Sequence, residues 1–268
     1  MTGSASGSRL GVVGLGRMAL ALLLPLIEAG LVPSAGVSAV VASRASAERL
    51  AQAHGLQVGT DPATAWAAPV VLLAVKPQQL EAAAAAAPAG GSGLLISVLA
   101  GVTLERLQGL FPGWRCVRAV PNTPSLVRCG LTGLALAPDV RTEEGAWVRR
   151  LFDQVGEVHE LPETQLDAFL ALTSSGPGFV ALLAEALADG AVAAGLPRQL
   201  AHHLTHRTLA GTAALLEAKA LHPGQLKDMV SSPAGTTMAG LRQLERAGVR
   251  SALIEAVVAA AERSRELA

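Results

Sequence analysis

A glycine-rich segment near the N-terminus has the residue types and spacing of a phosphate-binding turn. It is Gly14-Leu15-Gly16-Arg17-Met18-Ala19, between an expected strand over residues 10–13 and an expected helix over 17–30. The first glycine permits a tight turn, the second lets the backbone approach a pyrophosphate, and the small last residue lets helix and strand pack closely. Because the helix N-terminus also faces the phosphates, the segment predicts dinucleotide binding; the alternative is a glycine turn that binds nothing.

The end of the second expected strand, over residues 37–42, carries a basic residue instead of an acidic one. An NAD site has Asp or Glu there to hold the ribose 2′-hydroxyl. This chain has Ser43 and Arg44, and a guanidinium pairs well with a 2′-phosphate. We therefore expect NADPH as the cofactor, with NADH possible. The alternative is that Arg44 is a solvated loop residue and that Ser46 caps the next helix.

Two later strand ends carry polar residues beside proline. One is Ala74-Val75-Lys76-Pro77 and the other is Val120-Pro121-Asn122-Thr123-Pro124. Ligands of open α/β sheets bind at the carboxyl ends of strands, so Lys76 and Pro77 suit a cofactor wall and Asn122 suits ligand contact. For both segments an ordinary structural turn is an equally good interpretation.

The second half of the chain has small and hydroxyl residues at two expected helix starts. Ser174-Ser175-Gly176-Pro177-Gly178 fits either plain capping or backbone N–H groups left open for a ligand. The segment from Ser231 to Thr237 holds more hydroxyl groups than one cap needs. Since a helix N-terminus attracts negative charge, we expect an anion, such as a carboxylate, to bind at the helix that starts near Gly235.

Other reactive side chains give weaker signals. His202 and His206 are one helical turn apart beside His203, but no third ligand accompanies them, so we expect no metal site. Cys116 and Cys129 do not make a disulfide framework, and we expect two reduced thiols in a cytoplasmic protein.

The order of the expected elements divides the chain into two domains. Of its 268 residues, those before about residue 160 alternate between short apolar runs and Ala-rich helical stretches, which predicts a doubly wound, mostly parallel α/β sheet. Only helical patterns follow. We therefore expect a dinucleotide-binding domain over residues 1–161 and an all-α domain over 162–268. Several later helices are apolar around much of their circumference, so we expect the helical half to pair with a second copy.

Overall composition excludes some classes of partner. The 21 basic and 21 acidic residues cancel, and there is no tyrosine, so we expect neither nucleic-acid binding nor attraction to an anionic membrane surface. The apolar stretch over residues 179–196 contains Glu185 and Asp189, and we interpret it as a buried helix of a globular protein.

Several separated blocks together resemble the pyrroline-5-carboxylate reductase family, almost from end to end. The blocks are the glycine segment, Ala74-Val75-Lys76-Pro77, Arg118-Ala119-Val120-Pro121-Asn122-Thr123-Pro124, Ser175-Gly176-Pro177 and the segment His222–Thr237. The resemblance implies a Rossmann domain, a helical domain that interlocks with a partner subunit, and larger rings of dimers. It also implies reduction of 1-pyrroline-5-carboxylate to L-proline by NADPH or NADH, the last step of proline biosynthesis.

The resemblance also implies roles for individual residues. The expected cofactor residues are Gly14, Leu15, Gly16, Arg17, Met18, Ala19, Ser43, Arg44, Ala74, Val75, Lys76, Pro77 and Asn122. The expected substrate residues are Glu163, Ser232, Gly235, Thr236 and Thr237. The cyclic imine accepts a hydride from the cofactor, so Thr237 is expected to act mainly by orienting the ring nitrogen.

Three positions depart from the family pattern. Most relatives have Asn or Gln in place of Arg17, Tyr in place of Phe179 and Gly in place of Ala234. The departures at Arg17 and Phe179 are the only support for an alternative, a non-catalytic NADP-binding redox sensor. A reductase of a related cyclic imino acid is a second alternative. A β-hydroxyacid dehydrogenase needs a lysine base on the helix after the domain boundary. Residues 163–217 contain no lysine, and the first one is Lys219, which counts against this class of enzyme.

Overall fold

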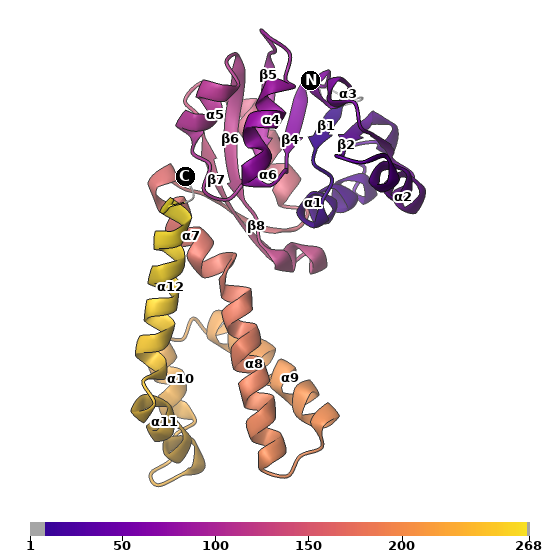
Figure 1. The fold of residues 1–268 in the computed structure, drawn as a ribbon. Coiled ribbons are helices and arrows are strands. Elements are labelled where there is room, and N and C mark those ends of the chain that lie inside the picture. The colour runs from indigo at the N-terminus through magenta and orange to yellow at the C-terminus, as the bar shows by residue number, and fades with distance from the viewer. Residues whose placement is uncertain (1–8, 267–268) are drawn as a thin grey trace. The chain divides into compact units, whose positions relative to one another are not determined.

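The computed structural model describes residues 9–266, and its first part contains an eight-stranded sheet, most of which can be followed in Figure 1. The strands are β1 (Leu10–Val13), β2 (Val37–Val40), β3 (Gln57–Gly59), β4 (Val70–Leu73), β5 (Gly93–Ser97), β6 (Trp114–Val120), β7 (Gly130–Leu136) and β8 (Gly156–Glu160). Their order in the sheet is β3-β2-β1-β4-β5-β6-β7-β8, and only the β6–β7 pair is antiparallel. β1 therefore lies between β2 and β4, where the winding of the chain reverses, which is where such sheets bind ligands.

The strands β1 and β4 are apolar throughout because both of their faces are buried. In β4, Leu72 belongs to the hydrophobic cluster on one face of the sheet, and its neighbours Val71 and Leu73 belong to the cluster on the other. Successive side chains of a strand point to opposite faces, so a strand covered on both sides has no position that faces solvent.

Helices cover both faces of this sheet. On one face pack α1 (Arg17–Glu28), α2 (Arg44–His54) and α6 (Thr142–Phe152); on the other pack α3 (Pro62–Trp66), α4 (Leu80–Ala85), α5 (Leu104–Leu110) and α7 (Leu166–Thr173). Short 3-10 turns are η1 (Ser34–Gly36), η2 (Pro77–Gln79), η3 (Thr123–Val127) and η4 (Glu163–Gln165). The doubly wound, mostly parallel sheet expected from the sequence is confirmed.

The second part of the chain is all-helical, as expected. Its helices are α8 (Gly176–Ala193), α9 (Arg198–Ala218), α10 (Pro223–Met229), α11 (Thr236–Arg246) and α12 (Val249–Glu266). Only small side chains, Ala184 and Ala188, are buried in α8 within the single chain, while Leu182 is 67% exposed. Within the single chain α8 is therefore largely exposed, and its burial against a second copy stays a prediction.

The chain divides into two compact units. The first ends at Ser174 and also takes in the chain from Ala260 onward; the second is Ser175–Ala259. α7 thus belongs with the sheet, and the division after residue 161 stays a prediction. In the part that the structure describes, one stretch, Glu163–Ala193, has the length and composition to cross a membrane, and 17% of its most apolar window is buried. Core helices of globular proteins meet the same criterion.

Candidate active site

A pocket of about 620 Å³ opens at the carboxyl ends of β1, β2 and β4. Its wall includes the predicted Gly14, Leu15, Gly16, Ala74, Val75 and Lys76. The backbone N–H of Gly14 donates to the carbonyl of Val40 at 2.9 Å, which ties the glycine turn to the end of β2. The pocket therefore lies where the reversal of strand order places a dinucleotide.

The two glycines of the turn serve different purposes. Gly14 has a φ of +94°, and a Cβ there would lie 2.8 Å from the carbonyl oxygen of Ala74 and 2.8 Å from the nitrogen of Val75. The fold itself therefore requires Gly14. At Gly16 a Cβ would meet no protein atom within 4 Å, so it would project into open space beside the start of α1. That open space fits a pyrophosphate, because phosphate groups bind close to the backbone at a helix N-terminus.

The charges of the pocket also fit a dinucleotide phosphate. Two cationic residues, Arg49 and Lys76, are among the residues that line it, and no Asp or Glu is among them. The acidic residue that holds a ribose 2′-hydroxyl in NAD sites is thus missing from this wall. The lining favours a cofactor with additional negative charge.

The residues that follow β2 are arranged differently from the expectation. Ser43, not Ser46, is the N-cap of α2, since its Oγ accepts the backbone N–H of Ser46 at 3.3 Å. Arg44 turns its Nε to Glu48 at 2.9 Å, and its side chain is 89% exposed. Neither Ser43 nor Arg44 lines the pocket, whereas Ser46 and Arg49 do. The phosphate-reading role of Arg44 stays a prediction.

The other residues predicted for the cofactor lie beside the pocket and do not line it. Arg17 is exposed at the first position of α1, Met18 packs against the core, and Ala19 is fully buried against the sheet. Pro77 begins η2. The structure adds polar wall residues that sequence reasoning missed, namely Arg49, Thr60 and Gln79. The available signal was helical spacing, because Arg49 is one turn beyond Ser46 on the same face of α2.

Asn122 has a structural role for its side chain. It is 4% exposed, its Nδ2 donates to the carbonyl of Thr173 at 2.9 Å, and its Oδ1 accepts the N–H of Leu131 at 2.8 Å. These partners favour the structural turn, and the cofactor contact of Asn122 stays a prediction. The physical reason is that a buried amide needs partners, and here β7 and the end of α7 supply them.

Glu163 is held by an internal network of charged groups. Its Oε1 accepts the N–H of Leu104 at 2.7 Å and Nη1 of Arg118 at 3.1 Å. Arg118 is 2% exposed and also donates to Asp167 at 3.2 Å, and Asp167 accepts the hydroxyl of Ser264 at 2.7 Å. This network supports a buried guanidinium, so Glu163 acts in the fold, and its substrate contact stays a prediction.

The segment predicted to hold an anion forms a tight turn before α11. The N–H of Gly235 donates to the carbonyl of Ser232 at 3.0 Å, and a Cβ on Gly235 would lie 2.4 Å from the Ser232 hydroxyl oxygen. Thr236 and Thr237 are the first two residues of α11, and no side chain caps this helix within the described residues. The first N–H groups of α11 are therefore open for a negatively charged group.

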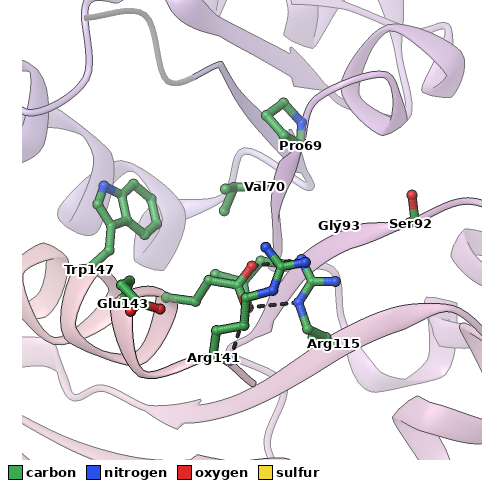
Figure 2. Close-up of a pocket in the computed structure, with 10 residues that line it drawn as sticks. Pro69, Val70, Ser92, Gly93, Arg115, Arg141, Glu143 and Trp147 are labelled. Atoms are coloured by element: carbon green, nitrogen blue, oxygen red, sulfur yellow. Dashed lines mark hydrogen bonds and ion pairs between the residues drawn. The ribbon is translucent and has the colours of Figure 1, made fainter. Parts of the chain in front are cut away.

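A second pocket, of about 490 Å³, lies at the amino ends of β4, β5 and β6. Figure 2 shows it between the strand ends near Pro69 and Ser92 and the helix that carries Trp147. Arg115 makes two hydrogen bonds to Glu144 there, at 2.6 and 2.7 Å. These bonds lower the pKa of Glu144 and raise that of Arg115. The two charges of the pair cancel, and the amino ends of parallel strands are not where such sheets bind ligands.

Among the described residues, no group of three His, Cys, Asp or Glu side chains could hold a metal.

A Rossmann unit with an acid-free dinucleotide pocket, followed by a helical unit, defines a class of nicotinamide-dependent oxidoreductases. The family described as pyrroline-5-carboxylate reductase dimerisation matches residues 163–267, and the family described as NADP oxidoreductase coenzyme F420-dependent matches residues 9–101. The pyrroline-5-carboxylate reductase of Synechocystis is 43% identical over 97% of this chain and 98% of its own length. That of Arabidopsis thaliana is 38% identical over 98% and 96%. The chain belongs to the pyrroline-5-carboxylate reductase family, and the resemblance stated from the sequence is confirmed.

Solved structures agree with this assignment. The pyrroline carboxylate reductase of Plasmodium falciparum, solved with NADP bound, has a TM-score of 0.88 at 28% identity and covers 97% of both chains. The enzyme of Streptococcus pyogenes has a TM-score of 0.90 at 27% identity, covering 96% of this chain and 98% of that one. The fold class and a nicotinamide cofactor are thereby confirmed.

Proposed function

We propose that this protein reduces 1-pyrroline-5-carboxylate to L-proline with NADPH. The observation that carries the proposal is the similarity to reductases of this name over nearly the whole chain, which includes both the glycine turn and the turn before α11. The acid-free lining of the dinucleotide pocket supports NADPH as the preferred cofactor. As a reductase of this kind, the protein takes part in proline biosynthesis.

Within the nucleotide unit, the glycine turn and Lys76 hold the cofactor phosphates. The open space at Gly16 admits the pyrophosphate, and Lys76 contributes positive charge from the neighbouring strand end. When bound, NADPH supplies the hydride that adds to the imine carbon, and the ring nitrogen takes one proton to become the secondary amine of proline. The protein needs no nucleophile for this reaction, since the chemistry is that of the cofactor.

Within the helical unit, the start of α11 binds the substrate. The open N–H groups of Thr236 and Thr237 bind the substrate carboxylate, because a helix N-terminus stabilises an anion. The Thr237 hydroxyl hydrogen-bonds the ring nitrogen and thereby fixes the orientation of the imine. Ser232 and Gly235 support this turn through the hydrogen bond between their backbones.

The first experiment is a steady-state assay of the full-length protein with 1-pyrroline-5-carboxylate, run separately with NADPH and NADH. We expect the protein to oxidise both cofactors, with faster turnover for NADPH than for NADH. Faster turnover with NADH would keep the reaction and contradict the cofactor preference. Cofactor binding without oxidation would favour either the reductase of another cyclic imino acid, tested with a six-membered imino acid, or the redox sensor.

The role of Thr237 is tested with a matched pair of variants. Thr237→Val removes the hydroxyl while it keeps the shape, and Thr237→Ser keeps the hydroxyl. We expect kcat/KM to fall about 10- to 100-fold for Thr237→Val and to change little for Thr237→Ser, because one oriented hydrogen bond to the reacting group is lost. NADPH affinity stays the same in both. Unchanged turnover in Thr237→Val contradicts the orienting role.

We propose further that the helical unit forms a homodimer. In the single chain its helices expose large apolar side chains: Val180, Leu182, Leu187, Met238, Leu244, Ile254 and Val258 are all at least 45% exposed. Burial of such a surface against a second copy is favourable in proportion to the apolar area removed from water. Light scattering at micromolar concentration tests this: a dimer or a ring of dimers is expected, and a monomer contradicts it. A cytoplasmic location is also proposed, from the two free cysteines.

A further inference from the structure

We infer that Arg49 and Ser46, and not Arg44, recognise the adenosine 2′-phosphate and set the preference for NADPH. The inference rests on the proposed function for the identity of the cofactor. Its starting observation is the geometry of α2, from which two arginine side chains leave in different directions. Arg49 and Ser46 line the dinucleotide pocket, and Arg44 does not.

The helical register explains why the two arginines differ. Positions three or four apart share a face of a helix, so Ser46, Arg49 and the buried Leu50 form the face that meets the pocket. Arg44 and Glu48 are also four apart, on another face, and their side chains are 89% and 67% exposed. The guanidinium of Arg44 is thus already paired in solvent, away from the pocket wall.

In the part of the chain that the structure describes, the side chain of Arg49 has no carboxylate partner and could therefore pair with a phosphate group. Within the described residues it makes no ion pair, although it is exposed on the pocket side of α2. A nearby acid, Asp61, lies between the wall residues Thr60 and Pro62, but its carboxylate accepts the N–H of Ala63 at 3.0 Å. The Asp61 side chain is therefore committed to capping α3, and it is not among the pocket residues.

Arg49 lies at the end of the pocket where the adenosine ribose of the cofactor is expected. The glycine turn and Lys76 define the pyrophosphate end, at β1 and β4, whereas Arg49 and Ser46 project from the helix that follows β2. In dinucleotide folds the end of β2 meets the adenosine ribose. A guanidinium with a neighbouring hydroxyl there supplies charge-assisted hydrogen bonds to a 2′-phosphate, which carries close to two negative charges.

The test compares Arg49→Gln with the matched control Arg44→Gln in the full-length protein. Both positions are exposed on α2, and glutamine is a good helix former, so both variants should keep the wild-type Tm. Calorimetric titration measures binding of adenosine 2′,5′-bisphosphate and of adenosine 5′-monophosphate. Neither measurement uses the imine substrate, so failure of the proposed reaction does not affect the result.

We expect Arg49→Gln to weaken binding of the 2′,5′-bisphosphate at least about 10-fold, in keeping with the loss of a charged hydrogen bond, and to leave the monophosphate within about 2-fold. Arg49→Lys should lose less, because it keeps the charge, and Arg44→Gln should change neither ligand more than about 3-fold. Three results overturn the inference: a loss in Arg44→Gln as large as in Arg49→Gln, an unchanged Arg49→Gln, or a wild-type protein that binds both nucleotides equally.

Discussion

The two glycines of the nucleotide turn should respond in opposite ways to the same added methyl group. In Gly14→Ala, the new Cβ would lie 2.8 Å from two backbone atoms, in a backbone conformation of φ +94°. The left-handed conformation costs an alanine about 1–2 kcal/mol, and forced overpacking costs about 1–3 kcal/mol. We therefore expect Gly14→Ala to lose about 2–5 kcal/mol of folding free energy, which lowers Tm by about 4–20 °C.

Gly16→Ala should leave the fold intact and damage the cofactor site. The backbone of Gly16, at φ −87° and ψ −171°, is open to any residue, and the added Cβ meets no protein atom within 4 Å. Stability should therefore stay equal or rise slightly, since alanine reduces the entropy of the unfolded chain. NADPH affinity should fall about 10-fold or more, because the methyl group occupies the space where the backbone approaches the pyrophosphate.

Thermal unfolding by circular dichroism and titration of NADPH fluorescence distinguish the two effects. The expected pattern is lower Tm for Gly14→Ala and wild-type Tm with weak NADPH binding for Gly16→Ala. The reasoning is refuted if Gly16→Ala binds NADPH as tightly as the wild type, or if Gly14→Ala melts at the wild-type temperature.

Three further predictions concern other parts of the chain. Burial raises the pKa of the Cys116 thiol to about 12, whereas Cys129 is exposed, so a thiol reagent at pH 8 should titrate one cysteine in the folded chain and two in urea; two in the folded chain would contradict this. The hydrogen bonds from Arg115 lower the pKa of Glu144, so this pair stabilises the fold above the ordinary carboxyl pKa and loses that effect as pH falls through the lowered value. We therefore expect Glu144→Gln to lower Tm by about 2–4 °C at pH 7 and by less at pH 3. A Tm difference of the same size at both pH values would contradict this prediction. Ala234 has a φ of +58°, so Ala234→Gly should relieve about 1 kcal/mol of strain and raise Tm by about 2–4 °C, and a lower Tm would argue against strain at this residue.

The strongly apolar strands of the sheet could be predicted from the sequence, but its last two strands, β7 and β8, could not. β1, β4 and β5 are short apolar runs between turn signals, so their composition predicts that they are buried. β7 contains Gly130 and Gly133, and β8 alternates Glu157 and His159 with a single buried Val158, so neither strand has a clear apolar pattern. They form because β6 offers a free edge to β7 and β7 to β8, which is a tertiary condition.

The sequence by itself determined the family, the order of the two kinds of domain and the glycine turn, because each depends on residue types at fixed short spacings. The tertiary structure decided which side chains reach the pocket. Ser43, Arg44 and Arg49 lie within two helical turns, yet only helix register and the partner Glu48 separate the solvated arginine from the one on the pocket wall. In the same way, the position of Asn122 at a strand end predicted that its side chain would contact a ligand. Only the folded chain brings Thr173 and Leu131 to the two polar atoms of that side chain. A side chain's partners come from distant segments, so its availability to a ligand cannot be worked out from local spacing.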